Sequence, residues 1–357
     1  MPLELKRLIG LLVVTWVAVG CTSAASDRAA TPTAASTLAL GSMPSAVSTT
    51  APADGGTLAP TSAAPTTVPV TVPATAPPAT VAAACDQTDG VLTTPSGRHV
   101  LVRAKGVAPG SPLVFIIHGY TGTPTGIEKF AEFTAMANAA SVAVAYPEGT
   151  PVADSDGFGW DSGSGIFSTS GVDDVAALVE MFDAVIATGC VDPAAITLSG
   201  ESNGAAITLV ALCDARLRDR ITSAVMVIPA VDGGVLAHCS PGGRPLPLSV
   251  VTGLLDKTAP YNGGRGSLLP QEAWFTQAAS LVNGCAPGAP TREQFDAHAQ
   301  RLTPAGCAAC TEMFAIDDGT HTWPGTSRGV AGLRPGTFDL DGRLLSLALS
   351  RTPGCLV

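Results

Sequence analysis

Short runs of apolar residues alternate with longer segments of helical spacing along most of the chain, and this alternation restricts the possible folds more than any other feature. The runs are largely continuous rather than alternating in polarity, which is typical of strands buried on both faces. Strands separated by helices pair in parallel. The sequence therefore predicts an α/β fold with a mostly parallel central sheet and helices on both faces. The predicted strands are 113–117, 141–145, 195–198, 224–228, 248–252 and 312–316, and the predicted helices are 127–140, 172–188, 203–216 and 271–282.

The beginning of the chain has a different character. Lys6 and Arg7 precede an apolar run over 8–19 that ends at Gly20 and Cys21. This arrangement is typical of a secretory signal, and the run is too short for a comfortable membrane span. Small residues before Cys21 resemble a bacterial lipobox, so we expect a lipoprotein-type signal peptide over 1–21 with the lipid on Cys21. An ordinary cleaved signal is the alternative.

Residues 22–84 consist almost entirely of Ala, Thr, Pro and Ser. Such a segment buries too little apolar surface to offset the entropy lost on ordering, so we expect a disordered linker. The folded domain is then expected over 85–357. Its expected location is the extracellular face of the cell membrane, with the lipid anchor as the membrane contact, or the exterior if the protein is secreted without a lipid.

The charge balance argues against one class of partner. The chain has 19 Lys and Arg against 29 Asp and Glu, a net charge of -10. This charge repels a phosphate backbone, and the sequence shows no cluster of basic residues that would offset it. We therefore expect no nucleic-acid partner.

The cysteines support an exported domain. The chain has nine, and removing Cys21 for the lipid leaves an even eight between Cys85 and Cys355, as expected for disulfides in an oxidising compartment. Eight cysteines allow many pairings, so the pattern alone leaves the connectivity open. Cys307 and Cys310 have the spacing of half a zinc site, but a second close pair is lacking and disulfides are favoured.

A candidate nucleophile lies in the stretch Gly200-Glu201-Ser202-Asn203-Gly204. It follows a predicted buried strand and opens a predicted helix, which is the context of the sharp turn that exposes a nucleophilic serine. A second G-x-S-x-G match at 325–329 follows Trp323-Pro324 in a turn-rich stretch and lacks this context. We therefore predict Ser202 as the nucleophile.

A nucleophilic serine needs a base and an acid that orients the base. His321 lies in a loop after the last predicted strand, and Asp256 follows the strand at 248–252. The chain order Ser202, Asp256, His321 is the order found in α/β-hydrolases. Asp317 and Asp318 compete with Asp256 for the role of the acid, but triad partners generally meet across separate loops.

Two further kinds of site residue are expected around this triad. The backbone N–H groups of Asn203, which opens the helix, and of Tyr120, in the loop after the first core strand, are the predicted oxyanion-hole donors, with Thr121 as the next candidate. Trp160 and Trp323 are predicted to line the substrate cleft with their aromatic faces; simple packing is the alternative.

Six motifs characterise the region from about 85 to 357: HGYTG at 118–122, YPEGT at 146–150 followed by GFGW, LSGESNGA at 198–205, GLLDKTAPYNGG at 253–264, NGC at 283–285 and GTHTWPG at 319–325. Together they resemble the extracellular esterase family that includes polyhydroxybutyrate depolymerases, feruloyl esterases and acetylxylan esterases. This resemblance implies an α/β-hydrolase fold with Ser202 as nucleophile, Asp256 as acid and His321 as base. Glu201 stands where the family more often has a hydrophobic residue, and Ala205 where it more often has a glycine.

The resemblance also implies two disulfides, Cys285 with Cys307 and Cys213 with Cys239. The activity it implies is hydrolysis of carboxylic esters through an acyl-enzyme, without a metal or an organic cofactor. The expected substrate is a polyester oligomer or an acylated polysaccharide. A catalytically inactive binding module of the cell envelope and a serine peptidase of the same fold are the alternatives.

Overall fold

The computed structural model describes residues 85, 88–169, 171–327, 335–350, 352, 354 and 355. The predicted signal peptide, the lipidation site Cys21 and the linker over 22–84 lie outside the described residues. Among the described residues, no helix is both long enough and apolar enough to cross a membrane.

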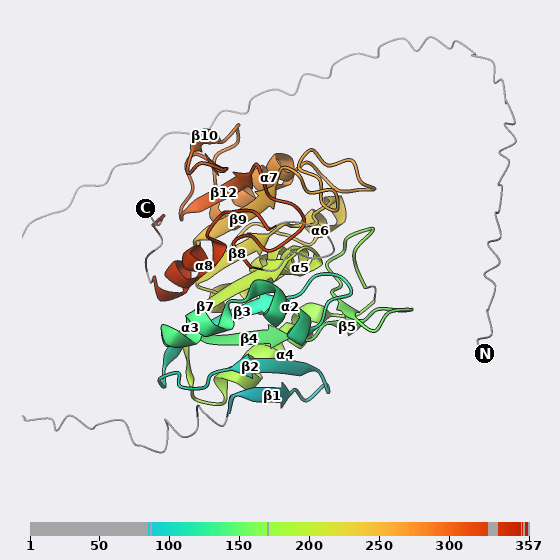
Figure 1. Cartoon of the computed structure of the whole chain (residues 1–357). Helices are drawn as coiled ribbons and strands as arrows, with labels where there is room; N and C mark the ends of the chain where they lie inside the picture. The colour runs from blue at the N-terminus through green and yellow to red at the C-terminus, as the bar shows by residue number, and fades with distance from the viewer. Residues whose placement is uncertain are drawn as a thin grey trace, which may run out of the picture. The chain divides into compact units, whose positions relative to one another are not determined.

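A ten-stranded sheet forms the centre of the domain, in the order β1-β2-β4-β3-β7-β8-β9-β12-β11-β10, and it can be followed from β1 to β10 in Figure 1. The six strands from β4 to β12 pair in parallel, while the two outer strands at each edge pair antiparallel. The strands are β1 (Gly90–Thr93), β2 (His99–Arg103), β3 (Ser111–Ile117), β4 (Ala143–Pro147), β7 (Val191–Glu201), β8 (Ser223–Val227), β9 (Leu248–Gly253), β10 (Thr291–Gln294), β11 (Ala299–Thr303) and β12 (Thr311–Ile316). A separate two-stranded sheet pairs β5 (Thr150–Pro151) with β6 (Phe158–Gly159).

Helices cover both faces of the sheet. Alternate residues along each strand face opposite sides of the sheet and contribute to two separate apolar cores. One core contains residues of α4 (Asp174–Ile186), α5 (Asn203–Cys213), α6 (Gly233–Ala237) and α7 (Gln271–Asn283). The other contains residues of α2 (Pro124–Ala131), α3 (Thr134–Ala139) and α8 (Leu340–Leu349). The predicted architecture, a mostly parallel sheet between two helical layers, is confirmed.

Every strand and helix predicted above has a counterpart, but one prediction is wrong. The single helix expected over 127–140 is two helices, α2 and α3, because Glu132 adopts a left-handed conformation (φ 54°) that ends α2. The antiparallel edge strands β1, β2, β10 and β11 were not predicted.

The eight cysteines of the domain form four disulfides. They are Cys85–Cys190, Cys213–Cys239, Cys285–Cys307 and Cys310–Cys355. Both pairings implied by the resemblance are present. Cys307 and Cys310 bond to different partners, so they do not act together as half of a zinc site.

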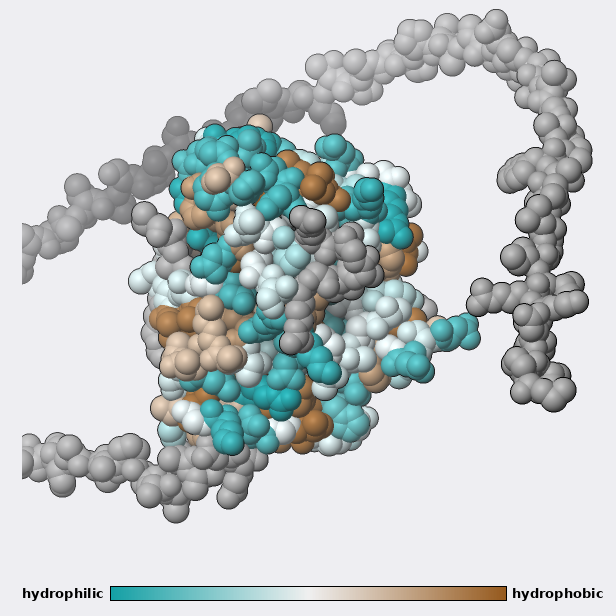
Figure 2. Space-filling model, viewed as in Figure 1, coloured by the Kyte–Doolittle hydropathy of each residue, from teal (hydrophilic) through white to brown (hydrophobic). Residues whose placement is uncertain are grey.

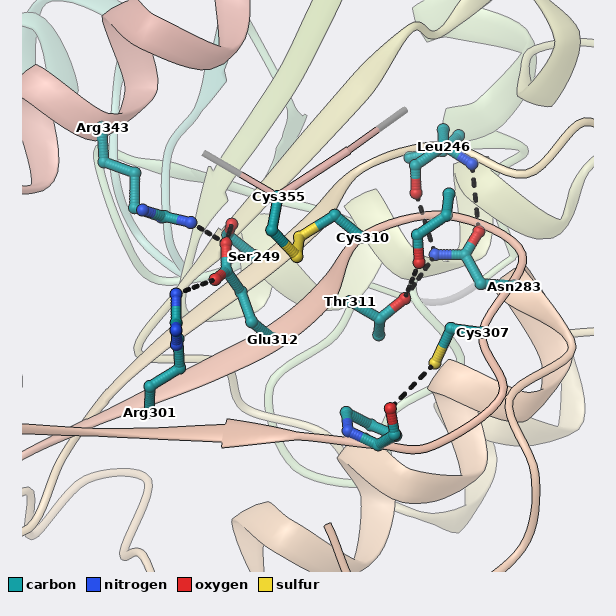
Figure 3. The surroundings of a disulfide bond; sticks show 12 residues. Leu246, Ser249, Asn283, Arg301, Cys307, Cys310, Thr311, Glu312, Arg343 and Cys355 are labelled. Atoms are coloured by element: carbon teal, nitrogen blue, oxygen red, sulfur yellow. Dashed lines mark hydrogen bonds and ion pairs between the residues drawn. A yellow bond between two sulfur atoms is a disulfide. The ribbon is translucent and has the colours of Figure 1, made fainter. Parts of the chain in front are cut away.

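A buried ionic cluster lies beside the Cys310–Cys355 disulfide (Figure 3). Glu312 of β12 is fully buried and pairs with Arg343 of α8, while Arg301 of β11 lies 4.0 Å from its other oxygen. Ser249 of β9 also donates to this carboxylate, at 2.8 Å. A buried carboxylate needs such partners to offset its desolvation, and here they connect α8, β9 and β11 to the strand that leads to His321.

The surface is mixed in character. On the face shown in Figure 2, hydrophilic residues are interspersed with several separate hydrophobic patches. The large apolar side chains that are more than a third exposed come from distant parts of the domain, for example Val91, Met136, Leu255 and Phe295. Scattered exposure of this kind is normal for a folded domain.

Candidate active site

Ser202, Asp256 and His321 meet at the carboxyl edge of the sheet, where ligands bind in open α/β folds. Ser202 directly follows β7, Asp256 lies in the loop after β9, and His321 lies in the loop after β12. His321 Nδ1 is 2.6 Å from Asp256 Oδ2, and His321 Nε2 is 3.0 Å from Ser202 Oγ. Residues 65 and 119 positions apart thus form one continuous hydrogen-bonded chain.

The turn that carries Ser202 is sharp and strained. Ser202 adopts φ 55° and ψ -114° between β7 and α5, a conformation that residues other than glycine rarely take. The two flanking glycines are required sterically: a Cβ on Gly200 would overlap the carbonyl oxygen of Gly204, and one on Gly204 would overlap that of Ile117. The structure thus places Ser202 in the strand–turn–helix context that the sequence predicted.

Asp256 is held firmly in position. Its side chain is fully buried, and its second oxygen, Oδ1, accepts the backbone N–H groups of Thr258 (2.7 Å) and Ala259 (2.8 Å). Oδ2 is therefore directed at the ring of His321. Because Oδ2 is an acceptor, the proton of the neutral imidazole is placed on Nδ1, which leaves Nε2 free to accept the proton of Ser202.

Burial and three charged neighbours determine the protonation of His321. Burial lowers its pKa, but the hydrogen bond and charge of Asp256 and the charge of Glu201 outweigh burial, so the pKa is raised above its ordinary value. The positive charge of Arg265 opposes this increase. A base with a raised pKa holds a proton more strongly once it has received one.

A cavity of about 410 Å³ opens onto Ser202 and His321. Ile127 and Phe130 of α2, with Phe167 from the loop before α4, provide its apolar wall. Tyr120 and Thr121 line the same cavity, and Asn203 is the first residue of α5, where backbone N–H groups lack helical acceptors. These positions suit oxyanion-hole donors, and the role of Tyr120 and Asn203 stays a prediction.

His118 shapes the loop after β3. It is buried, its Nδ1 lies 2.8 Å from the Gly119 carbonyl oxygen, and its Nε2 accepts the backbone N–H of Gly149 at 3.2 Å. These contacts require a neutral ring with the proton on Nδ1. Burial lowers the pKa of His118 to about 4, so the ring is uncharged near neutral pH and is unsuited to act as the base.

The prediction that Trp160 and Trp323 line the cleft is wrong. Both side chains have zero solvent exposure, and neither contributes to the cavity. The Nε1–H of Trp160 donates to the His118 carbonyl (2.9 Å), and that of Trp323 donates to Asp341 Oδ1 (2.9 Å). The rings pack in the two cores on opposite faces of the sheet, where a large apolar area is removed from water.

The side chain of Asn203 has a structural role that sequence reasoning missed. It is fully buried and holds the loop over 160–167: its Oδ1 accepts the Trp160 N–H (2.8 Å), and its Nδ2 donates to the carbonyls of Trp160 (3.1 Å) and Phe167 (2.6 Å). The amide thereby positions one aromatic wall of the cavity. The signal available in the sequence is the polar side chain directly after the nucleophile.

The rival acids have other partners. Asp317 pairs with His298 at 2.8 Å, and Asp318 accepts the backbone N–H of Thr337 at 3.2 Å. In the second G-x-S-x-G match, which lies partly outside the described residues, Ser327 Oγ donates to Glu132 at 2.8 Å. The structure thus brings Asp256, rather than Asp317 or Asp318, to His321.

The sheet order, the turn at Ser202 and the succession Ser202, Asp256, His321 define an α/β-hydrolase fold. Comparison with known proteins found no matching family model and no matching curated relative. Among solved structures, the chain is similar to acetyl xylan esterase from Aspergillus awamori, with 16% identity, TM-score 0.49, and coverage of 65% of this chain and 93% of that one. It is also similar to esterase PE8, with 16% identity, TM-score 0.41, and coverage of 65% and 92%. An esterase of Pyrobaculum calidifontis has 15% identity, TM-score 0.35, and coverage of 46% and 65%.

Proposed function

We propose that this protein is a serine esterase that hydrolyses carboxylic esters through an acyl-enzyme on Ser202. The observation that carries the proposal is the hydrogen-bonded chain from Asp256 through His321 to Ser202, at 2.6 and 3.0 Å, at the mouth of a cavity. The distance between Ser202 Oγ and His321 Nε2 is short enough for direct proton transfer from nucleophile to base.

In the first step, Ser202 Oγ attacks the ester carbonyl carbon while its proton passes to His321 Nε2. The carbonyl oxygen becomes an oxyanion, and the backbone N–H groups of Tyr120 and Asn203 are the donors we assign to it. The ester C–O bond then breaks, and the proton on Nε2 passes to the leaving alkoxide oxygen. The products of this step are the free alcohol and the acyl group on Ser202.

In the second step, water replaces the alcohol. His321 Nε2 takes a proton from the water as its oxygen attacks the acyl carbon, and the same proton returns to Ser202 Oγ when the acyl–serine bond breaks. Asp256 holds the ring through Nδ1 in both steps and stabilises the imidazolium. The carboxylic acid then leaves the cavity.

The cavity limits the acyl group. Its apolar wall of Ile127, Phe130 and Phe167 and its volume of about 410 Å³ suit a short or medium acyl chain or a single aromatic acyl group. We propose ester-linked hydroxyacid oligomers or acylated polysaccharides as the substrate class. Both present a small acyl unit on a long chain that can extend away from the site.

The cellular location forms part of the proposal. A lipid on Cys21 followed by the linker would hold the domain at the extracellular face of the membrane. Replacing Cys21 with Ser should release the protein into the medium, which fractionation of producing cells measures. A membrane-bound Cys21→Ser variant would contradict the anchor without affecting the assignment of the active site.

Replacing Ser202 with Ala tests the activity. We expect the variant to lose ester hydrolysis and fluorophosphonate labelling while retaining its circular dichroism spectrum and melting temperature. A panel of hydroxybutyrate oligomers, feruloyl esters, acetylated xylan and nitrophenyl esters, assayed with wild type and variant, identifies the substrate class. Hydrolysis by Ser202→Ala at the wild-type rate would refute the proposal.

Two other results would redirect the assignment. A folded wild-type protein that neither reacts with a fluorophosphonate nor turns over any ester would be a binding module with a hydrolase fold. Faster cleavage of peptides than of matched esters would indicate a peptidase.

A further inference from the structure

The cavity contains a carboxylate that the triad mechanism does not use. Glu201 is the last residue of β7 and directly precedes Ser202, and it lines the same cavity as Ser202 and His321. Its side chain is only 12% exposed. A nearly buried carboxylate costs considerable desolvation energy unless a nearby charge or donor offsets that cost.

The nearest charged partner of Glu201 is the base itself. Glu201 Oε1 lies 3.7 Å from His321 Nε2, the same nitrogen that is 3.0 Å from Ser202 Oγ. On its other side the carboxylate lies against the backbone of Gly119, whose N–H lowers the pKa of the Glu201 carboxyl. A Cβ at Gly119 would overlap Oε2, so the absence of a side chain there makes room for the carboxylate.

His321 is thus placed between two carboxylates. Asp256 contacts Nδ1 and Glu201 faces Nε2, the nitrogen that receives the serine proton. Before the reaction the ring is neutral and gains little from Glu201. When the proton of Ser202 reaches Nε2, the ring carries a full positive charge near both carboxylates, in a site where water screens poorly.

We propose that Glu201 is a positioning residue that acts through His321, its ionised carboxylate stabilising the imidazolium that forms each time Nε2 takes a proton. This inference rests on the proposed function, because it concerns the base of that reaction. Glu201 exchanges no proton with the substrate, and the bonds made and broken are those of the two steps above. Its contribution is larger in the transition state than in the resting enzyme, which is the condition for accelerating the reaction.

The other charged groups around the base are few. His321 is influenced by Asp256, Glu201 and Arg265, and the ring of His118 at the end of β3 is neutral near pH 7. Of the described residues that line the cavity, none is Lys or Arg. Burial raises the pKa of Glu201, and the charge of His321 and the Gly119 N–H oppose this increase. Glu201 and His321 are therefore expected to titrate as a coupled pair.

The test is Glu201→Gln in the full chain, assayed for ester hydrolysis between pH 4 and 9. Glutamine keeps the size and the acceptor oxygen but removes the charge. We expect kcat at the pH optimum to fall by about fivefold to tenfold with little change in KM, because the loss is specific to the imidazolium. Without the nearby negative charge, His321 also loses its proton at lower pH. We therefore compare activity at pH 5 as a fraction of each protein's own maximum. This fraction should be roughly threefold to tenfold greater in the variant than in wild type.

Two further variants control the comparison. Glu201→Asp keeps the charge but shortens the side chain, and it should reproduce the acid side of the wild-type pH profile. Glu293→Gln removes a carboxylate that is 57% exposed on β10 and should behave as wild type. If Glu201→Gln fails to fold, Glu201→Asp decides the question. A wild-type pH profile with an undiminished kcat in Glu201→Asp supports the proposal. A changed acid limb of the pH profile, despite the retained charge, counts against it.

A spectroscopic measurement separates this inference from the proposed function. The chain has five histidines, so ring ¹⁵N labelling with assignment through His321→Gln isolates the resonance of His321. Its pKa should be lower in Glu201→Gln than in wild type, whether or not the protein turns over an ester. An unchanged His321 titration and an unchanged kcat in an active enzyme would refute the role of Glu201 and leave the esterase assignment intact. If the folded wild-type protein hydrolyses no ester, the esterase assignment is refuted instead.

Discussion

Replacement of Asp256 with Asn should disable the base while leaving the structure of the site in place. In wild type, Asp256 Oδ1 accepts two backbone N–H groups, from Thr258 and Ala259, and Oδ2 accepts from His321. Only the carbonyl oxygen of an asparagine can accept the two backbone donors. The NH₂ group of the asparagine must therefore face His321 Nδ1.

This orientation reverses the hydrogen bond to the ring. Because the asparagine NH₂ donates, Nδ1 has to accept, and the proton of the neutral imidazole moves to Nε2. Nε2 lies 3.0 Å from Ser202 Oγ and can then no longer take the serine proton. Loss of the base through the wrong tautomer lowers kcat by roughly 10³- to 10⁴-fold in serine hydrolases, which corresponds to about 4 to 5.5 kcal/mol of transition-state stabilisation.

The assay is single-turnover hydrolysis of a nitrophenyl ester by Asp256→Asn, with the folded state checked by circular dichroism. Asp317→Asn is the matched control, because Asp317 was a rival acid in the sequence, its side chain is 56% exposed, and it pairs with His298. We expect the control to retain wild-type kcat. A folded Asp256→Asn variant within tenfold of wild type, or a collapse of activity in Asp317→Asn, would show that the reasoning about the tautomer is wrong.

Two predictions concern stability and pH. Burial raises the pKa of Asp341 to about 6, above the value of 3.8 in an unfolded chain, so the folded state loses stability as pH rises through this interval. Asp341→Asn keeps an acceptor for Trp323 and removes the buried charge, so it should increase the free energy of unfolding by about 1 to 2 kcal/mol at pH 7.5 but not at pH 3.5. Urea titration measures this difference, and an equal gain at the two pH values would contradict the role of Asp341. Burial lowers the pKa of His118 to about 4 from 6.5, so the unfolded chain takes up a proton first and stability is lost as pH falls from 6.5 to 4. Over this interval wild type should lose about 3 kcal/mol more stability than His118→Asn does, so that parallel pH dependences of the two proteins would exclude His118 as the source.

The central part of the fold was predictable because local pattern and tertiary environment agree there. Buried parallel strands have continuous apolar sequences, and each central strand overlaps its predicted range. The edge strands β1, β10 and β11 were missed because they lack this signal; β10 is the sequence TREQ and is exposed along its whole length. β2 has a buried apolar run of only three residues, Val100 to Val102, between His99 and Arg103. The break between α2 and α3 falls at Glu132, a good helix former with no Gly or Pro beside it, so propensity gave no reason to end the helix there.

The catalytic candidates were predictable for a different reason. Each of the three follows a core strand, and in a parallel sheet the carboxyl ends of such strands lie at one edge, so their convergence follows from topology. Trp160 and Trp323 also lie in loops that follow core strands. Position along the chain, however, does not determine whether a side chain points into the cleft or into the core. Their indole N–H groups find acceptors inside the protein, on His118 and Asp341, and full burial of both rings is then favourable.

Glu201 is a second case in which the local sequence does not reveal the environment of a side chain. A strand residue before the nucleophile is expected to be apolar because β7 is buried on both faces, so a glutamate there reads as a disturbance of the turn. Its carboxylate is accommodated only because Gly119, more than eighty positions earlier, has no side chain and offers an N–H, and because His321, far later in the chain, provides a group that becomes positive. A charge that depends on two such distant partners is invisible in the local sequence. It can be recognised as part of the site only once the three segments are seen together.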